Sequence, residues 1–155
     1  MFKTIYAGLA LLLLATAASA QSDHSGSWHA IEERSSWSDG AFPKGFSLTI
    51  DLKFEGDKLI YHSENDTNKD AVQKLDWTAP LDGTVAPVVG QPRFNQVSVK
   101  PLGPNQYQFL ELKDGDVVVG AIWTFLPDKK TVVRWGVGKS PVGVSRAFIE
   151  YFARK

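Results

Sequence analysis

The sequence predicts an all-β protein, an antiparallel up-and-down meander of nine or ten strands that forms a barrel or a half-open barrel. Apolar and polar residues alternate with a period of two along most of the chain, and no stretch holds a helical period over three turns. Pro and Gly fall between the alternating segments rather than inside them. Short turns between nearly all neighbouring segments favour a meander barrel, because a Greek-key sandwich needs long crossovers.

The first segment is typical of a secretory signal peptide. A short basic start that ends at Lys3 precedes the apolar run Ile5–Ala15, and Ala18-Ser19-Ala20 fits a small-x-small cleavage pattern. The apolar run is shorter than the roughly 20 residues that a bilayer span needs. We therefore expect residues 1–20 to be cleaved, which leaves residues 21–155 as one exported domain. Its expected location is periplasmic or extracellular, with no integral membrane segment after cleavage.

The clearest strand lies at 46–54, where Phe46 begins an alternation of apolar and polar side chains. Glu55-Gly56-Asp57-Lys58 then predicts a hairpin turn, and Asp114-Gly115-Asp116 and Pro127–Lys130 predict two more. The expected strands, in order, are Ser27–Arg34, Phe46–Phe54, Leu59–Ser63, Val72–Ala79, a weak one at Thr84–Val89, Gln96–Leu102, Tyr107–Leu112, Val117–Phe125, Thr131–Val137 and Val144–Phe152.

The connection Ser35–Gly45 is rich in turn-forming residues, so we expect it to extend neither flanking strand. Trp37 and Phe42 nevertheless lie within it, and two large apolar side chains in a polar loop need an apolar surface. The mouth of the barrel is the nearest such surface. We expect this loop to fold over the open end.

Gly26-Ser27-Trp28 opens the first strand of the domain, and Arg146 lies on the last one. This pair resembles the calycin superfamily of lipocalins and fatty-acid-binding proteins, in which a G-x-W on the first strand packs against a basic side chain from the end of the barrel. The resemblance implies a lipocalin-like barrel with Trp28 in its base and the Arg146 guanidinium near the indole ring.

A second resemblance is to a family of small secreted bacterial β-proteins of unassigned function, and it covers about a third of the chain. Its elements are Leu81-Asp82-Gly83, Pro87-Val88-Val89-Gly90, Val97-Ser98-Val99-Lys100, Lys113-Asp114-Gly115 with Val117-Val118, and Pro127-Asp128 before Lys130-Thr131.

Composition excludes several classes of function. The chain has 17 basic and 17 acidic residues, so it lacks the excess of positive charge that a general nucleic-acid binder uses. It contains no Cys, which leaves neither disulfides nor thiolate metal ligands. The three His residues have no regular ligand spacing. We predict no metal and no cofactor.

Two motifs approach catalytic signatures without completing them. Gly138-Lys139-Ser140 resembles the end of a phosphate-binding loop, but Val133 stands where that loop needs Gly and no helix follows. Gly143–Ala147 lacks the last Gly of a nucleophile elbow, and every His precedes its Ser. A hairpin turn is the better interpretation of the first, and we expect the protein not to be an enzyme.

The aromatic residues are the strongest functional signal, with five Trp, nine Phe and four Tyr. They predict either a large packed core or an aromatic-lined pocket, and inward polar groups would distinguish the two. The candidate ligand-binding residues are Trp37, Phe42, Trp123, Arg134 and Arg146. We interpret the protein as a lipocalin-like binder of a small apolar or amphipathic molecule. The alternative is a packed envelope or interaction module without a ligand, and the choice between monomer and homodimer stays open.

Overall fold

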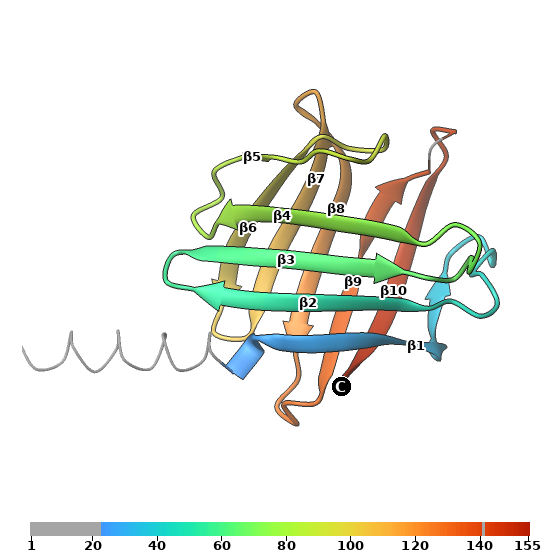
Figure 1. Ribbon diagram of the computed structural model, residues 1–155, viewed down its shortest axis with the longest axis horizontal. Coiled ribbons are helices and arrows are strands. Elements are labelled where there is room, and N and C mark those ends of the chain that lie inside the picture. The colour runs from blue at the N-terminus through green and yellow to red at the C-terminus, as the bar shows by residue number, and fades with distance from the viewer. Residues whose placement is uncertain (1–22, 141) are drawn as a thin grey trace, which may run out of the picture.

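A computed structural model describes residues 23–140 and 142–155, so the predicted signal peptide lies outside the described residues. The described residues fold as ten antiparallel strands in one sheet that curls into a nearly closed, calycin-like barrel (Figure 1). The strands are β1 (Gly26–Trp37), β2 (Leu48–Glu55), β3 (Lys58–Asn65), β4 (Gln73–Pro80), β5 (Ala86–Pro87), β6 (Gln96–Gly103), β7 (Gln106–Lys113), β8 (Asp116–Phe125), β9 (Thr131–Lys139) and β10 (Ser145–Arg154). This confirms the all-β meander, although the weak fifth strand shrinks to two residues.

The order of the strands in the sheet is β4-β3-β2-β1-β10-β9-β8-β7-β6-β5. Each strand pairs with the next strand in sequence except β4, which forms no ladder with β5. β1 pairs with β10, so the first and last strands meet. β4 contacts β5 and β6 without a hydrogen-bonded ladder, and the barrel is incompletely closed at this seam.

β1 bends and continues further than the sequence predicts. Its pairing with β10 shifts register between Ile31 and Ser36, then resumes at Ser36 and Trp37. Ser35 stabilises the shift, since its hydroxyl accepts from the Tyr151 N–H at 3.0 Å and donates to the Ile31 carbonyl at 2.8 Å. The expectation that Ser35–Gly45 extends neither strand is therefore wrong for its first three residues, because a side chain satisfies the backbone where the ladder is interrupted.

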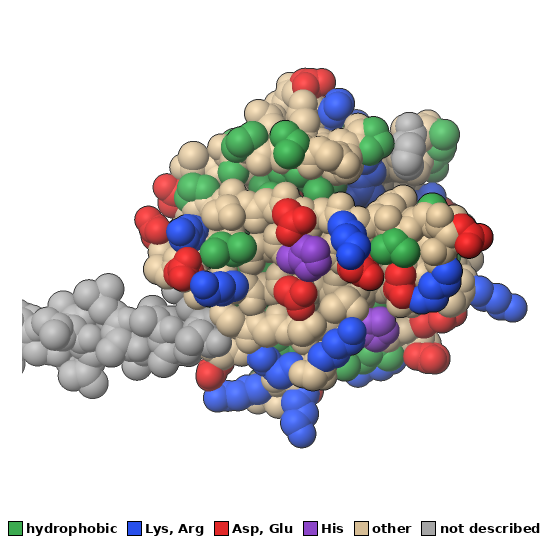
Figure 2. All heavy atoms as spheres, in the orientation of Figure 1, with side chains coloured by type: hydrophobic (Ala, Val, Ile, Leu, Met, Phe, Trp, Pro, Cys, Tyr) green, Lys and Arg blue, Asp and Glu red, His purple; other side chains and the backbone are tan. Residues whose placement is uncertain are grey.

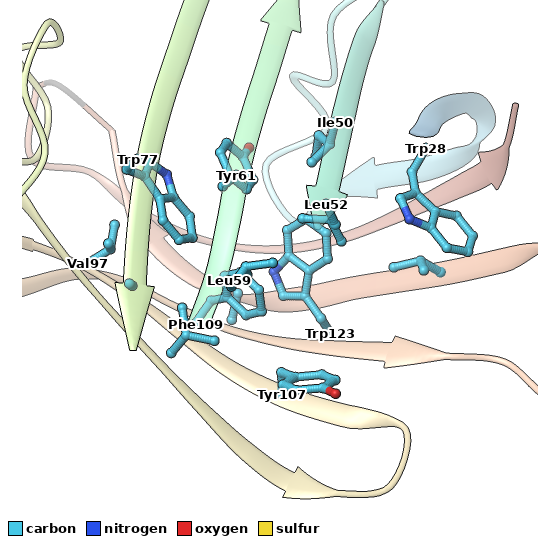
Figure 3. Packing of buried hydrophobic residues seen from close by; sticks show 14 of the residues in the cluster. Trp28, Ile50, Leu52, Leu59, Tyr61, Trp77, Val97, Tyr107, Phe109 and Trp123 are labelled. Atoms are coloured by element: carbon cyan, nitrogen blue, oxygen red, sulfur yellow. The ribbon is translucent and has the colours of Figure 1, made fainter. Parts of the chain in front are cut away.

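Inward-facing side chains of alternate strand positions form the core, as the period of two requires. Figure 3 shows Trp123 between Leu52 and Tyr107, with Phe109 alongside. The Trp123 ring stacks on Phe109 at 4.7 Å between centroids and on Phe152 at 6.0 Å. The largest fully buried side chains are Trp28, Tyr107, Phe152, Ile50, Leu59, Val99 and Val132.

The segment before β1 closes one end of the barrel. The His24 ring stacks on Phe125 at 4.1 Å, and its two nitrogens lie 3.2 Å from the Tyr107 hydroxyl and 3.3 Å from the side-chain amide oxygen of Asn105. The Trp28 indole N–H donates to the His24 carbonyl at 3.3 Å. We call this end the base of the barrel.

Gly26 and Trp28 lie at the base as the calycin resemblance implies, but the basic partner is Arg154 instead of Arg146. The Arg154 guanidinium lies 4.2 Å from the centre of the Trp28 ring, and it donates to the Ser25 carbonyl at 2.7 Å. The expected Trp28–Arg146 contact is wrong because β1 and β10 are antiparallel, which pairs Trp28 with Arg154 and carries Arg146 to the other end.

Both the backbone conformation and the space beside Arg154 require a glycine at position 26. Its φ is 148°, and a Cβ atom there would lie 2.4 Å from an Arg154 guanidinium nitrogen. Any other residue would displace the guanidinium from the Trp28 ring.

The outer faces of the barrel differ in character. Figure 2 shows charged side chains and His over the face formed by β2, β3 and β4, where His62 lies between Asp51 and Asp76 in the register. On the outside of β9, in contrast, Trp135 and Val137 are 49% and 57% exposed.

Candidate functional site

A cavity of about 360 Å³ occupies the half of the barrel away from the base. No described residue of the base, neither His24 nor Trp28, contributes to its wall. Its aromatic lining comes from β1, β3, β4, β7, β8, β10 and the segment before β6 and consists of Trp37, Tyr61, Trp77, Phe94, Phe109, Trp123 and Phe148. The base has a separate, smaller pocket of about 120 Å³, whose wall includes His24, Trp28 and Arg154.

Two pairs of stacked rings form the deep wall. Tyr61 and Trp77, from neighbouring strands, lie with their rings almost parallel at 4.4 Å (Figure 3). The edge of Trp77 approaches Phe109, which stacks in turn on Trp123. Burial raises the pKa of the Tyr61 hydroxyl, so this group stays neutral at physiological pH. This part of the wall is aromatic and mostly apolar.

A buried ion pair also faces the cavity. The Arg134 Nε donates to Glu150 Oε2 at 2.8 Å, and a terminal guanidinium nitrogen contacts the same oxygen. Glu150 Oε1 accepts from the Trp37 indole N–H at 3.1 Å. The guanidinium lies within 6 Å of the Trp123 and Phe152 ring centres. Both carboxylate oxygens and the guanidinium are thus partnered, as a buried charge requires.

Burial by itself lowers the pKa of Arg134, because it disfavours the charged form. The Glu150 carboxylate, together with Tyr61 and Glu111, favours the charged form more strongly, so the pKa of Arg134 is raised. The guanidinium stays charged. It holds Glu150 in place, and Glu150 in turn orients Trp37.

Arg146 lies nearer the open end, opposite Gly138 of β9. Its guanidinium lies 4.4 Å from the centre of the Trp37 ring, and one terminal nitrogen is 3.1 Å from Asp39. The Arg146 Nε is buried and has no hydrogen-bond partner among the described residues. Buried N–H groups are rarely left unpaired, so this atom is a candidate contact for a ligand.

Four of the five candidate residues from the sequence, Trp37, Trp123, Arg134 and Arg146, line the cavity. Phe42 does not line it, and instead packs edge-on against Trp37 at 5.3 Å and against Phe46 at 4.9 Å. The loop that contains Phe42 thus supports the Trp37 side of the wall. A role of these residues in binding stays a prediction.

Sequence reasoning missed Glu150, Tyr61, Trp77 and Phe109. A signal for Glu150 was present, because it alternates with Phe148 and Phe152 on the inward face of the last strand. An acid at an inward position needs a buried partner, and Arg134 on the neighbouring strand is that partner.

Within the described residues, no group of three or more His, Cys, Asp or Glu is arranged to hold a metal ion. Over the same residues, no helix has the length and hydropathy of a membrane-spanning segment.

The sequence matches no protein-family model and no curated protein. Its structure is similar to that of the zebrafish ileal bile acid-binding protein in complex with cholic acid, with a TM-score of 0.55 and 13% sequence identity. The match covers 86% of this chain and 100% of that chain. At this identity the likeness establishes the calycin-like fold. The resemblance to secreted bacterial β-proteins stays a prediction.

Proposed function

We propose that this protein is an exported binding protein that holds a small apolar or amphipathic molecule inside the barrel. The observation that carries the proposal is the hollow half of the barrel, where aromatic side chains surround a few convergent polar groups. Its volume of about 360 Å³ lies in the range of small-molecule sites. A barrel of this size can be filled by its own side chains or can hold one small ligand. The cavity away from the base is the larger of the two, at about 360 Å³ against about 120 Å³ for the pocket at the base.

Two further observations support the proposal. The structurally similar zebrafish protein is a bile acid-binding protein with cholic acid bound. Export is supported by the apolar leader and the Ala18-Ser19-Ala20 cleavage pattern, and we propose a periplasmic or extracellular location. We propose no catalytic role and no cofactor.

A titration with Nile red, a neutral apolar dye that fluoresces in apolar surroundings, tests the proposal. Val97 lines the cavity and is 2% exposed, so Val97→Phe fills part of it and should weaken dye binding about tenfold or more. Val137→Phe, on the exposed outer face, is the matched control and should leave dye affinity unchanged. Equal weakening by both variants, or no saturable dye binding to the wild type, would refute the binding function.

A second candidate is the interaction module, and the half-exposed Trp135 and Val137 favour it, because exposed apolar surface often marks a contact with another protein. Native mass spectrometry of the protein from its own host distinguishes the two, since it reports a bound small molecule and the number of subunits together.

A further inference from the structure

The outside of β7, β8, β9 and β10 carries three rows of side chains without a charged residue. In Figure 1 these strands lie behind β2, β3 and β4. Inward neighbours such as Phe109 and Trp123 are buried, so the residues that alternate with them point outward. The register places the middle row across all four strands, and it consists of Gln108, Ile122, Trp135 and Ile149.

The next row, toward the end opposite the base, consists of Leu110, Gly120, Val137 and Ala147. Neither row contains a buried residue. An antiparallel sheet that packs one face on the core usually has a polar outer face, as β2, β3 and β4 do in Figure 2. These rows depart from that rule, and together with the third row we call them the apolar outer face.

The polar groups of the apolar outer face are suited to contact with an identical surface. The third row, toward the base, consists of Gln106, Thr124, Val133 and Tyr151. Its amide and hydroxyl groups, like the amide of Gln108, can both donate and accept hydrogen bonds. Such groups can pair with their own copies across a two-fold axis, whereas a charged group near that axis would meet a like charge.

A hollow of about 480 Å³ lies on this face beside Gly120 and the half-exposed Trp135. It is also lined by Leu110, Ile122 and Val137. The fold does not require glycine at position 120, because a Cβ atom there would meet only Leu110 Cδ2 among the described atoms, at an ordinary 3.7 Å. Glycine inside a strand costs stability and often marks the close approach of another surface. The missing side chain thus keeps open a hollow that the barrel itself does not use.

Trp135 and the hollow are placed so that two copies can exchange them. Trp135 lies opposite Ile122 in the register. Gly120 lies opposite Val137, one row away, so Gly120 and Trp135 are diagonal neighbours. A two-fold axis that lies in an interface and runs along the line from Ile122 to Val137 exchanges these two positions. Each Trp135 then meets the hollow of the other copy, and Val137 meets its own copy.

The size of the face determines how strong such a contact can be. The four strands are eight to ten residues long. With strands about 4.8 Å apart and about 3.4 Å per residue, their outer surface measures roughly 600 Å². A standard interface buries about 800 Å² on each partner, and smaller interfaces belong to weak, transient complexes. The face therefore fits a reversible association rather than an obligate one.

We propose that the apolar outer face binds a second copy of this chain in a reversible two-fold dimer, with Trp135 of each copy in the hollow beside Gly120 of the other. The proposal goes beyond the binding of a small molecule and does not depend on it, since neither Trp135 nor Gly120 lines the cavity inside the barrel.

Sedimentation velocity of the purified protein, at concentrations from about 2 to 500 µM, tests the proposal. The wild type should change from monomer to dimer with a Kd on the order of 10 to 100 µM, as expected for a small interface. Gly120→Glu fills the hollow and places a charge on the face, so it should weaken association by about tenfold or more. Gly103→Glu is the matched control, because a Cβ atom at this β6 glycine meets no described atom within 4 Å and the residue lies outside the face. It should keep the wild-type Kd.

The absence of Cys from the chain allows a second test, of position. Val137→Cys lies on the proposed axis, so two copies should form a disulfide-linked dimer under mild oxidation. Val89→Cys is the control, because Val89 is 82% exposed against 57% for Val137, and random collisions would link it at least as fast. We expect Val137→Cys to link much faster.

Each result decides for or against the dimer. A wild type that stays monomeric over the whole range refutes it. An unchanged Kd in Gly120→Glu, or equal linking rates of the two Cys variants, shows that association uses another surface and also refutes it. Far-UV circular dichroism confirms that each variant is folded, and Trp135→Ser takes the place of Gly120→Glu if the latter is not.

Vesicles of neutral phosphatidylcholine test the other occupant that an apolar face could have. If the wild type stays monomeric but sediments with the vesicles, and Gly120→Glu does not, the face contacts lipid and the dimer proposal is wrong. All of these measurements are made without Nile red, so their failure leaves the proposed binding function to its own test.

Discussion

Replacement of Trp28 by Ala should destabilise the protein by about 3 to 5 kcal/mol, the usual loss for a buried Trp or Phe. The side chain is 1% exposed, its ring meets Phe125 edge-on at 5.5 Å, and its N–H donates to the His24 carbonyl. The variant also removes the ring on which the Arg154 guanidinium lies. Since domains are stable by roughly 5 to 15 kcal/mol, the loss is a large fraction of the total.

Urea unfolding, followed by far-UV circular dichroism, measures this loss directly. The corresponding decrease in melting temperature is more than about 10 °C for a domain of this size. Trp135→Ala is the matched control, because that Trp is 49% exposed and its loss should change stability by less than about 1 kcal/mol. A loss below about 1 kcal/mol for Trp28→Ala would refute the assignment of Trp28 to a packed base.

Three further predictions concern the ion pair, pH and export. Glu150→Gln leaves Arg134 charged and buried without its partner and should cost about 3 to 5 kcal/mol in urea unfolding, whereas Glu55→Gln in an exposed pair should cost about 1 kcal/mol or less. Burial lowers the pKa of His24 below 6.5, against the opposing effect of its Asn105 hydrogen bond, so the unfolded chain binds more protons and stability should decrease as pH falls through and below about 6.5. His24→Gln should remove this decrease in the urea midpoint between about pH 7.5 and 5.5, and an unchanged pH dependence would show that His24 is not its source. The mass of the exported protein should correspond to a chain that begins at Gln21, and a mass that includes Met1 would contradict the signal-peptide assignment.

The sequence predicts the strands and their order well because alternation is a local property that one buried face imposes on each strand. Phe46–Phe54 and Tyr107–Leu112 show it, and both are strands in the structure with ends that differ by one or two residues. The bend of β1 is not local in this sense. It depends on a hydrogen bond from the Tyr151 N–H to the Ser35 hydroxyl, and these two residues are more than a hundred positions apart in the chain.

The mouth of the cavity could be predicted only in part for the same reason. Trp37 and Phe42 are conspicuous in a polar loop, and both contribute to that side of the barrel. Which of them faces the cavity depends on how far β1 extends. Because β1 reaches Trp37, its indole comes within reach of Glu150 and Arg146, and Phe42 is left to pack behind it against Phe46.

Three arginines on the last two strands illustrate what periodicity can decide and what it cannot. Arg134, Arg146 and Arg154 all occupy inward positions of β9 and β10, which alternation alone predicts. Their chemistry differs because their partners come from elsewhere in the chain. Backbone carbonyls at the base hold Arg154, and Glu150 holds Arg134 by two nitrogens. Arg146 is held at one terminal nitrogen by Asp39, and its Nε has no hydrogen-bond partner among the described residues.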